Sequence, residues 1–129
     1  MSTQRRVLVT GSRKWPHRDM VYAALYRQYT EHGPFIVVHG ACSRGAEAMA
    51  ADWVRQHGAS RGVTEEPWPP QWRRGGYGVG PWRNFAMINS RPDLVLGFIL
   101  NDSPGASFTV AGARREGIPV YVESLPRPS

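Results

Sequence analysis

Short apolar segments alternate with longer segments of helical character along the whole chain. The apolar segments span residues 6–11, 35–38, 93–100 and 117–122, and a shorter, more polar strand candidate spans residues 62–67. Residues 18–32, 46–57, 81–88 and the segment after Pro104 have the spacing or the start signals of helices. We therefore predict an α/β fold in three αβα layers, with a mostly parallel five-stranded sheet and helices on both faces.

The composition of each predicted strand indicates its place in the sheet. Residues 93–100 are the most apolar run, which is typical of a central strand covered on both faces. Residues 62–67 carry charge and end at a proline, which favours an edge strand. Glu65 and Glu66 are adjacent and face opposite sides in a strand, which argues against a paired-carboxylate site. We expect Gly58 to end the second helix and residues 124–129 to form a loose tail.

Length and cysteine content limit the class of protein. A chain of 129 residues fits one domain covering residues 1–129. No run approaches the roughly 18 apolar residues of a membrane helix, and the first residues lack the apolar core of a signal peptide. Cys42 is the single cysteine, which excludes an internal disulfide and fits a reducing compartment. We expect a cytoplasmic protein that has no membrane partner.

The chain is strongly basic, with a formal net charge of +6 and a sequence pI of about 10.2. Of its 16 basic residues only Lys14 is a lysine, and the arginine fork suits phosphate better than an ammonium group does. Such a charge is compatible with nucleic acid, with a polyanionic small molecule, or with an ordinary basic surface. Charge alone does not choose among them.

Glycine-bearing turns with polar or basic residues follow the predicted strands at four places. These are Gly11, Ser12 and Arg13 with Trp15 nearby; Gly40, Ser43, Arg44, Gly45 and Glu47; Gly80, Arg83 and Asn84; and Ser103, Gly105, Ala106 and Ser107. Because parallel strands end at one edge of a sheet, we expect the four junctions to share one rim. Free N–H groups at helix starts and the Arg side chains attract phosphate or another anion. We predict a ligand site on this rim, with no metal and no cofactor.

Residues 68–80 differ in composition from the rest of the chain. The segment is too rich in Gly and Pro for a helix or strand, yet it holds Trp68, Trp72, one Tyr and two Arg. A loop of this length in a compact domain is usually functional or disordered, and its aromatic content argues against disorder. Arg and aromatic side chains stack on bases and neutralise phosphates. We predict a binding loop or lid that carries Trp72.

The order and spacing of these motifs resemble the SLOG superfamily. The matching residues are Gly11-Ser12-Arg13 with Trp15, His39-Gly40-Ala41-Cys42 leading to Gly45-Ala46-Glu47, Trp72, Gly80-Pro81-Trp82-Arg83-Asn84 with Met87, and Ser103-Pro104-Gly105-Ala106-Ser107 with Thr109. The branch that the chain resembles is that of the short stand-alone YspA-related proteins of bacteria and their phages. The resemblance implies a Rossmann-like fold that binds nucleotide-derived ligands. Relatives include the LOG phosphoribohydrolases and the DNA-processing protein DprA, which binds single-stranded DNA.

Two positions depart from the pattern that this resemblance implies. Glu47 stands where the family usually has Asp, which keeps the charge on an arm one methylene longer. Thr109 stands where the hydrolases have their catalytic glutamate, and its hydroxyl supplies neither a carboxylate base nor a negative charge. Arg83 and Met87 match the Arg-x-x-x-Met start of a hydrolase helix. The chain thus keeps the binding arginine and lacks the cleaving carboxylate, unless Glu47 substitutes for it.

Three functions are compatible with the sequence. The first is a sensor or sequestering module for a nucleotide or phosphoribosyl-type small molecule. In this layout phosphate rests on Ser43 to Gly45, Arg83 and Ser103 to Ser107. Glu47 accepts from a ribose hydroxyl, Ser12, Arg13 and Trp15 line the base side, and the Trp72 loop is a lid. The second is a nucleotide N-glycosidase or related hydrolase in which Glu47 and Arg83 are catalytic. The third, ranked last because the basic residues are spread along the chain, is single-stranded nucleic-acid binding of the DprA type. Formation of a homo-oligomer is compatible with all three.

Overall fold

The computed structural model of the chain describes residues 4–69, 79–100 and 104–126, and for residues 79–82 the backbone alone. The strands are β1 (Arg5–Gly11), β2 (Phe35–His39), β3 (Thr64–Pro67), β4 (Leu94–Leu100) and β5 (Val120–Leu125). The helices are α1 (Arg18–His32), α2 (Gly45–Trp53), α3 (Val79–Asn89) and α4 (Pro104–Arg115), with a π-helical turn η1 (Val54–Gly58) and a 3-10 turn η2 (Ala59–Arg61) after α2.

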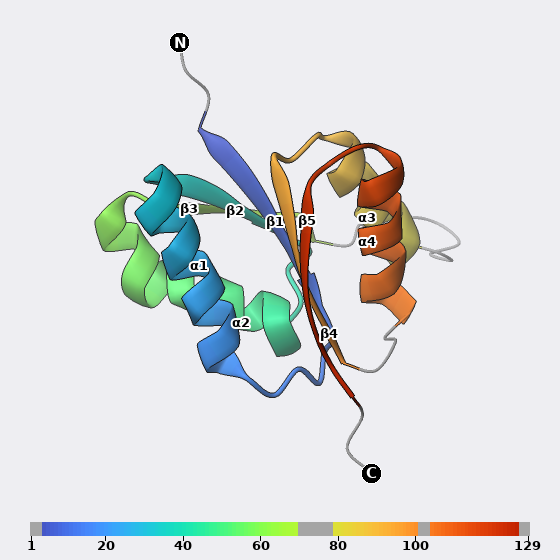
Figure 1. Cartoon of the computed structure of the whole chain (residues 1–129), viewed down its shortest axis with the longest axis horizontal. Coiled ribbons are helices and arrows are strands. Elements are labelled where there is room, and N and C mark those ends of the chain that lie inside the picture. Colours follow the sequence, from blue (N-terminus) through green and yellow to red (C-terminus); the bar gives the residue numbers. More distant parts are fainter. Residues whose placement is uncertain (1–3, 70–78, 101–103, 127–129) are drawn as a thin grey trace.

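The sheet has the order β3-β2-β1-β4-β5, and all four strand pairs are parallel. Helices α1 and α2 cover one face, and α3 and α4 cover the other (Figure 1). The α/β, Rossmann-like, three-layer prediction is confirmed. The β3 strand lies at an edge, as its charge predicted, and β4 lies between β1 and β5 inside the sheet.

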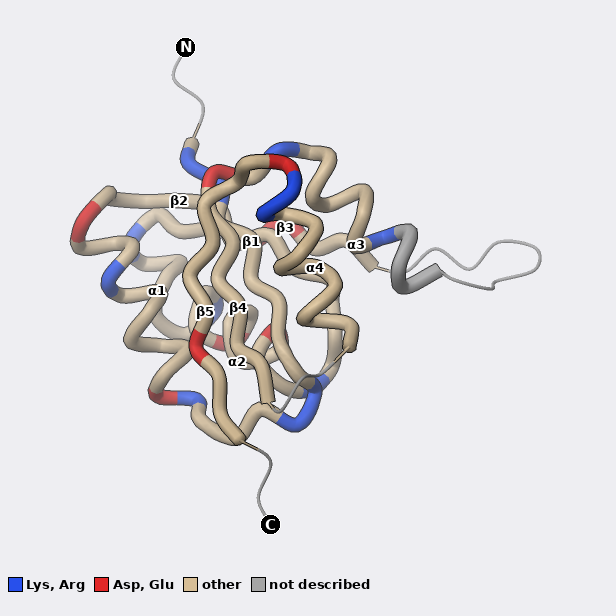
Figure 2. Tube along the Cα trace, turned by 45° about the vertical axis from the view of Figure 1, so that its right-hand side comes forward, with Lys and Arg blue, Asp and Glu red and all other residues tan. Residues whose placement is uncertain are grey.

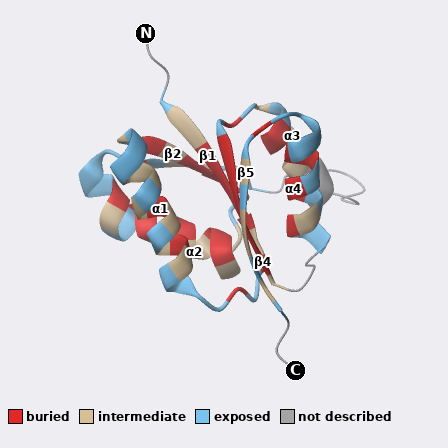
Figure 3. Cartoon of the chain, in the orientation of Figure 1, coloured by how far each residue is buried: buried red, intermediate tan, exposed pale blue. Residues whose placement is uncertain are grey.

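Side chains of β1 alternate between two apolar cores. Val7 and Val9 pack with residues of α1 and α2, whereas Leu8 packs with residues of α3 and α4. The strands therefore carry buried side chains on both faces, and most of β1 and β4 has the colour of buried residues in Figure 3. This two-sided burial explains why β1 and β4 are apolar runs without polar alternation.

The helix that begins with α2 continues past the glycine expected to end it. Gly58 has a right-handed φ of −76°, and the helical turns η1 and η2 carry on to Arg61. A Cβ at Gly58 would lie 2.9 Å from the Trp53 ring, so this glycine serves close packing. Gly62, with φ +81°, is the residue that ends the helix, because only glycine adopts this conformation at low cost.

Two other boundaries differ from the sequence prediction. Helix α3 begins at Val79, two positions before the proline that was expected in its first turn. Strand β5 runs to Leu125, and Ser124 and Leu125 pair with Ile99 and Leu100 of β4. The loose tail predicted over 124–129 is therefore wrong for its first two residues, which the sheet holds. Within the described ranges, no helix has the length and apolar character needed to cross a membrane.

Candidate functional site

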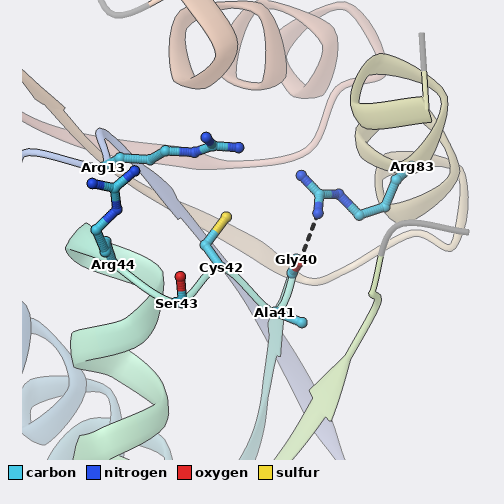
Figure 4. A pocket seen from close by; sticks show the side chains of 7 residues that line it. All are labelled: Arg13, Gly40, Ala41, Cys42, Ser43, Arg44 and Arg83. Carbon is cyan, nitrogen blue, oxygen red and sulfur yellow. Dashed lines mark hydrogen bonds between the residues drawn. The ribbon is translucent and has the colours of Figure 1, made fainter. Parts of the chain in front are cut away.

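A cleft opens where β1 and β2 end, beside the first turns of α3. Its walls are Arg13, Gly40, Ala41, Cys42, Ser43, Arg44 and Arg83 (Figure 4). Its volume is about 200 Å³, below the roughly 300–1,000 Å³ of pockets that enclose a whole drug-sized ligand. The described walls therefore suit a compact group, or one end of a larger molecule.

Gly45 brings the start of α2 against the end of β1. It has φ +79°, and a Cβ there would lie 2.2 Å from the carbonyl oxygen of Ser12. The next residue, Ala46, donates its N–H to that same carbonyl at 3.4 Å. Any side chain at position 45 would push the helix away from β1. The position of α2 on the rim of the cleft therefore depends on this glycine.

The Gly40 peptide is held from both sides. Its N–H donates to Oε1 of Glu47 at 2.5 Å. Its carbonyl accepts from Nη1 of Arg83 at 2.6 Å, the bond drawn as a dashed line in Figure 4. The Nε of Arg83 also donates to the amide oxygen of Asn84 at 3.2 Å. A Cβ on Gly40 would lie 2.8 Å from Cζ of Arg83, so glycine allows the guanidinium to rest on the loop. This pair of contacts fixes the floor of the cleft.

Three arginines from separate segments surround the cleft. Figure 4 shows Arg13 extending across the cleft toward Arg83, with the Arg44 guanidinium near the backbone end of Arg13. Arg13 and Arg44 are exposed, and none of the three forms an ion pair with a carboxylate in the described part of the chain. Arginines that form no ion pair are stabilised when an anion binds between them. The cleft is therefore suited to a phosphate or a similar anion.

Cys42 lines the same cleft, and its thiol is a hydrogen-bond donor. Its thiol donates to Oε2 of Glu47 at 3.4 Å. Burial raises the pKa of the Cys42 thiol above its ordinary value, and the charge and hydrogen bond of Glu47 raise it further, while Arg83 and Arg13 partly oppose this. The thiol is therefore protonated at neutral pH. A nucleophilic cysteine needs the opposite shift, so this group contributes polarity and shape.

The predicted residues of the first junction divide between wall and floor. Arg13 lines the cleft, whereas Ser12 is buried, with its hydroxyl accepting from the Leu100 N–H at 2.8 Å. Trp15 is only 2% exposed, its indole N–H donates to the His17 carbonyl, and its ring meets Phe98 edge-on. Ser12 and Trp15 therefore build the core under the cleft, and their contact with a ligand stays a prediction.

Residues at the start of α4 are separate from the cleft walls. Ala106 packs in a small core with Ile99 and Val110, and Thr109 is fully buried with its hydroxyl donating to the Gly105 carbonyl at 3.0 Å. Ser107 is half-buried on the same helix and does not line the cleft. Of the four predicted junctions, three meet at the described cleft. Gly80 lies in the first turn of α3, and Trp72 and Ser103 lie outside the described residues.

Sequence reasoning did not single out two of the cleft walls, Ala41 and Cys42. Ala41 has φ +59°, a left-handed conformation that no property of alanine indicates. Cys42 gave a signal only through its position inside the glycine-bearing turn. Elsewhere in the described residues, no group of three or more His, Cys, Asp or Glu is arranged to hold a metal ion.

Comparison with known proteins identifies the family. The model of the YspA, cpYpsA-related SLOG family matches residues 5–75, which is 71 of the 129 residues. The chain belongs to the YspA, cpYpsA-related SLOG family. The gene 61 protein of Mycobacterium phage D29 is 38% identical over 121 residues, covering 90% of this chain and 94% of that protein. No solved structure gives a significant match. The SLOG match spans β1 to β3 and so includes the loop from Gly40 to Arg44.

Proposed function

We propose that the chain binds a phosphate-bearing, nucleotide-derived small molecule in this cleft and acts as a sensor or sequestering module. The observation that carries the proposal is the convergence of Arg13, Arg44 and Arg83 on one cleft without a carboxylate partner among the described residues. Membership of a SLOG family supports a small-molecule ligand of nucleotide type. The charge of the cleft supports an anionic group on that ligand.

Each wall has a distinct part in this proposal. Arg13 and Arg44 bind the phosphate from the open side, and Arg83 binds it from the side of α3. The Ser43 hydroxyl adds an uncharged donor. The remainder of the ligand extends out of the cleft, because its volume of about 200 Å³ does not enclose a nucleotide.

Binding is favoured over hydrolysis by the state of Glu47. This carboxylate is buried, and its two oxygens accept from the Gly40 N–H and the Cys42 thiol. A general base or nucleophile needs a free oxygen directed at the substrate. At the other position where the resemblance places a catalytic group, Thr109 is fully buried and offers only a hydroxyl. We expect chromatography to detect no free base after incubation with nucleoside monophosphates, and release that stops in Glu47→Gln would reverse this view.

The ligand can be identified from the purified protein. Native mass spectrometry followed by denaturation should release a co-purified compound that contains phosphate. Calorimetry with that compound, and with AMP as a fixed probe, then compares the wild type with Arg13→Ala and Arg83→Ala. Each substitution should weaken binding by about 1.5–3 kcal/mol, the usual loss for a charged hydrogen bond.

The matched control is Arg114→Ala, which removes the same charge from an exposed position in the last turn of α4. It should leave the affinity unchanged, whereas a general electrostatic attraction would weaken binding equally in all three variants. Arg83 also donates to the Gly40 carbonyl, so its loss can lower stability. Binding to Arg83→Ala and to the wild type is therefore measured at temperatures equally far below the Tm of each protein. Unchanged affinity in both Arg13→Ala and Arg83→Ala would refute the proposed site.

A further inference from the structure

A buried histidine at the end of β2 connects the cleft to the edge of the sheet. His39 is 3% exposed. Its Nδ1 lies 3.0 Å from the backbone N of Ala41, and its Nε2 lies 3.1 Å from Oε1 of Glu65 on β3. Arg55 of η1 reaches the same carboxylate from the outside, with Nε 3.1 Å from Oε2 and Nη2 3.3 Å from Oε1. A continuous set of contacts therefore runs from the surface to the cleft loop.

These contacts determine which nitrogen of His39 carries the proton. A backbone N–H is only a donor, so Nδ1 must accept from Ala41 and is unprotonated. At Nε2 the partner is Glu65. Burial alone would raise the pKa of Glu65, but hydrogen bonds from His39 and Arg55 hold it below its ordinary value, so the group is a carboxylate that only accepts. Nε2 therefore donates, and the ring is the neutral Nε2–H tautomer.

The residue that His39 holds has a left-handed backbone conformation. Ala41 has φ +59°, in the left-handed region that disfavours residues with a Cβ. It lies on the cleft wall directly before Cys42, Ser43 and Arg44. The turn at Ala41 sets the direction in which this loop leaves β2. An acceptor fixed at Nδ1 stabilises that turn by giving the Ala41 N–H a partner.

We propose that His39 is a positioning residue for the ligand cleft: Glu65 and Arg55 select its Nε2–H tautomer, and its Nδ1 holds Ala41 in the left-handed turn that presents Ser43 and Arg44. The proposal rests on the function proposed above for the cleft. It adds that the edge strand β3 contributes to affinity without touching the ligand. It also explains how an alanine occupies a conformation that glycine adopts more readily.

The tautomer is tested first, in the unmodified protein without ligand. Long-range proton–nitrogen NMR correlation of His39 should show a protonated Nε2 and an unprotonated Nδ1 at neutral pH. Amide hydrogen exchange should show protection of the Ala41 N–H. A protonated Nδ1, or an Ala41 amide that exchanges as freely as an open loop, overturns the proposal whatever the cleft binds.

Two substitutions then test the roles of the two ring nitrogens of His39 separately. His39→Asn places an amide oxygen near the position of Nδ1, and His39→Gln places an amide near Nε2. Asn should keep the protection of the Ala41 N–H and an affinity for AMP near that of the wild type. Gln should lose the protection and bind AMP roughly tenfold more weakly. Adding Ala41→Gly to His39→Gln should restore part of the affinity, because glycine adopts the turn unaided.

The outcomes distinguish this inference from the proposed function. If the wild type binds neither AMP, inorganic phosphate nor its co-purified compound, the proposed function fails while Ala41 exchange still tests the role of His39. If both variants lose stability and affinity equally, His39 is a packing residue and the inference is wrong. If His39→Gln does not fold, the tautomer measurement on the wild type remains decisive.

Discussion

Two residues with positive φ shape the loop between β2 and α2, and they are supported in different ways. Gly45 has no side chain and allows close contact with the Ser12 carbonyl. Ala41 keeps its side chain and donates its backbone N–H to Nδ1 of His39 at the end of β2. The cleft therefore depends on two local conformations that cost free energy in an isolated peptide.

Gly45→Ala should destabilise the protein by about 2–5 kcal/mol, since it adds the left-handed penalty to a clash with backbone 2.2 Å away. The control is Gly105→Ala, because a Cβ at Gly105 meets no atom within 4 Å and the residue lies in α4. It should be neutral or stabilise by up to about 1 kcal/mol. Urea denaturation measures both; equal stability of the two variants would contradict this account of the loop.

Cys42 should be unreactive because burial and the neighbouring Glu47 both oppose its ionisation. Burial is the largest cause of its raised pKa, and the charge and hydrogen bond of Glu47 add to it. Iodoacetamide should therefore alkylate Cys42 more slowly than free cysteine at mildly alkaline pH, as followed by mass spectrometry. Glu47→Gln keeps an acceptor for the Gly40 N–H and removes the charge, so the reaction should occur at lower pH. An unchanged pH profile in this variant would show that burial alone protects the thiol.

At the scale of elements, one arginine joins three parts of the fold. Arg6 of β1 binds the Glu66 carboxylate on β3, with Nη2 2.5 Å from Oε2. Its Nη1 donates to the carbonyl of Ser90, just after α3, at 2.8 Å, and its Nη2 donates to the Ser90 hydroxyl at 3.0 Å. The indole N–H of Trp68 also donates to Glu66 at 2.7 Å. Arg6 thus connects the edge strand to the centre of the sheet and to the end of α3.

This connection should make stability depend on acid pH. The hydrogen bond from Arg6 lowers the pKa of Glu66, burial opposes it, and Trp68 lowers it further. A carboxyl with a lowered folded pKa contributes stability above its unfolded value of about 4.3, and the contribution is lost as pH falls through the folded pKa. Glu66→Gln should therefore reduce the loss of stability between about pH 7 and about pH 3 by at most about 1 kcal/mol, because the pair is partly exposed. Parallel pH curves for variant and wild type would contradict this.

The succession of elements could be predicted because it depends on local signals. Helix α1 was predicted over residues 18–32, the range observed, since its apolar spacing is regular and Gly33-Pro34 terminates it. The edge position of β3 followed from its charge. The continuation through η1 could not be predicted, because the reason for Gly58 is the Trp53 ring packed on it. The Trp53 ring packs against Tyr26 and Phe35, which come from other elements of the fold.

The site was predictable in part for the same reason. Parallel strands end at one edge, so a shared rim for Arg13, Arg44 and Arg83 followed from topology. The direction of each side chain on the rim did not. Ser12 and Trp15 point into the core, and the start of α4 is not part of the described cleft. These outcomes depend on packing between segments far apart in sequence.

At the scale of the molecule, the positive charge of the described residues is spread over separate parts of the chain and is not gathered in one patch. Figure 2 shows Lys and Arg at separate points of the trace, and several of them pair with carboxylates, such as Arg27 with Glu31 and Arg55 with Glu65. Binding of a single-stranded polyanion gains from many cations along one path. Among the described residues, three arginines that form no ion pair line the cleft.

A single-stranded oligonucleotide should accordingly show no saturable binding at about 0.15 M salt, as measured by fluorescence anisotropy. AMP should still bind, with an affinity that changes little with salt, because few ions are displaced. Saturable oligonucleotide binding that falls steeply with salt and disappears in Arg13→Ala would favour nucleic acid as the ligand instead.

The central place of β1 has a consequence for the order of events during synthesis. Its neighbours are β2, made shortly after it, and β4, whose Leu100 reaches Ser12 across 88 positions of sequence. While the ribosome is still adding residues, one edge of β1 has no partner and the floor of the cleft is unfinished. Pairing at such separation is slow, and an apolar strand edge left open is a point of aggregation. The cleft is therefore completed late in the synthesis of each chain, and a product that stops before β4 would be a target for chaperones or proteases.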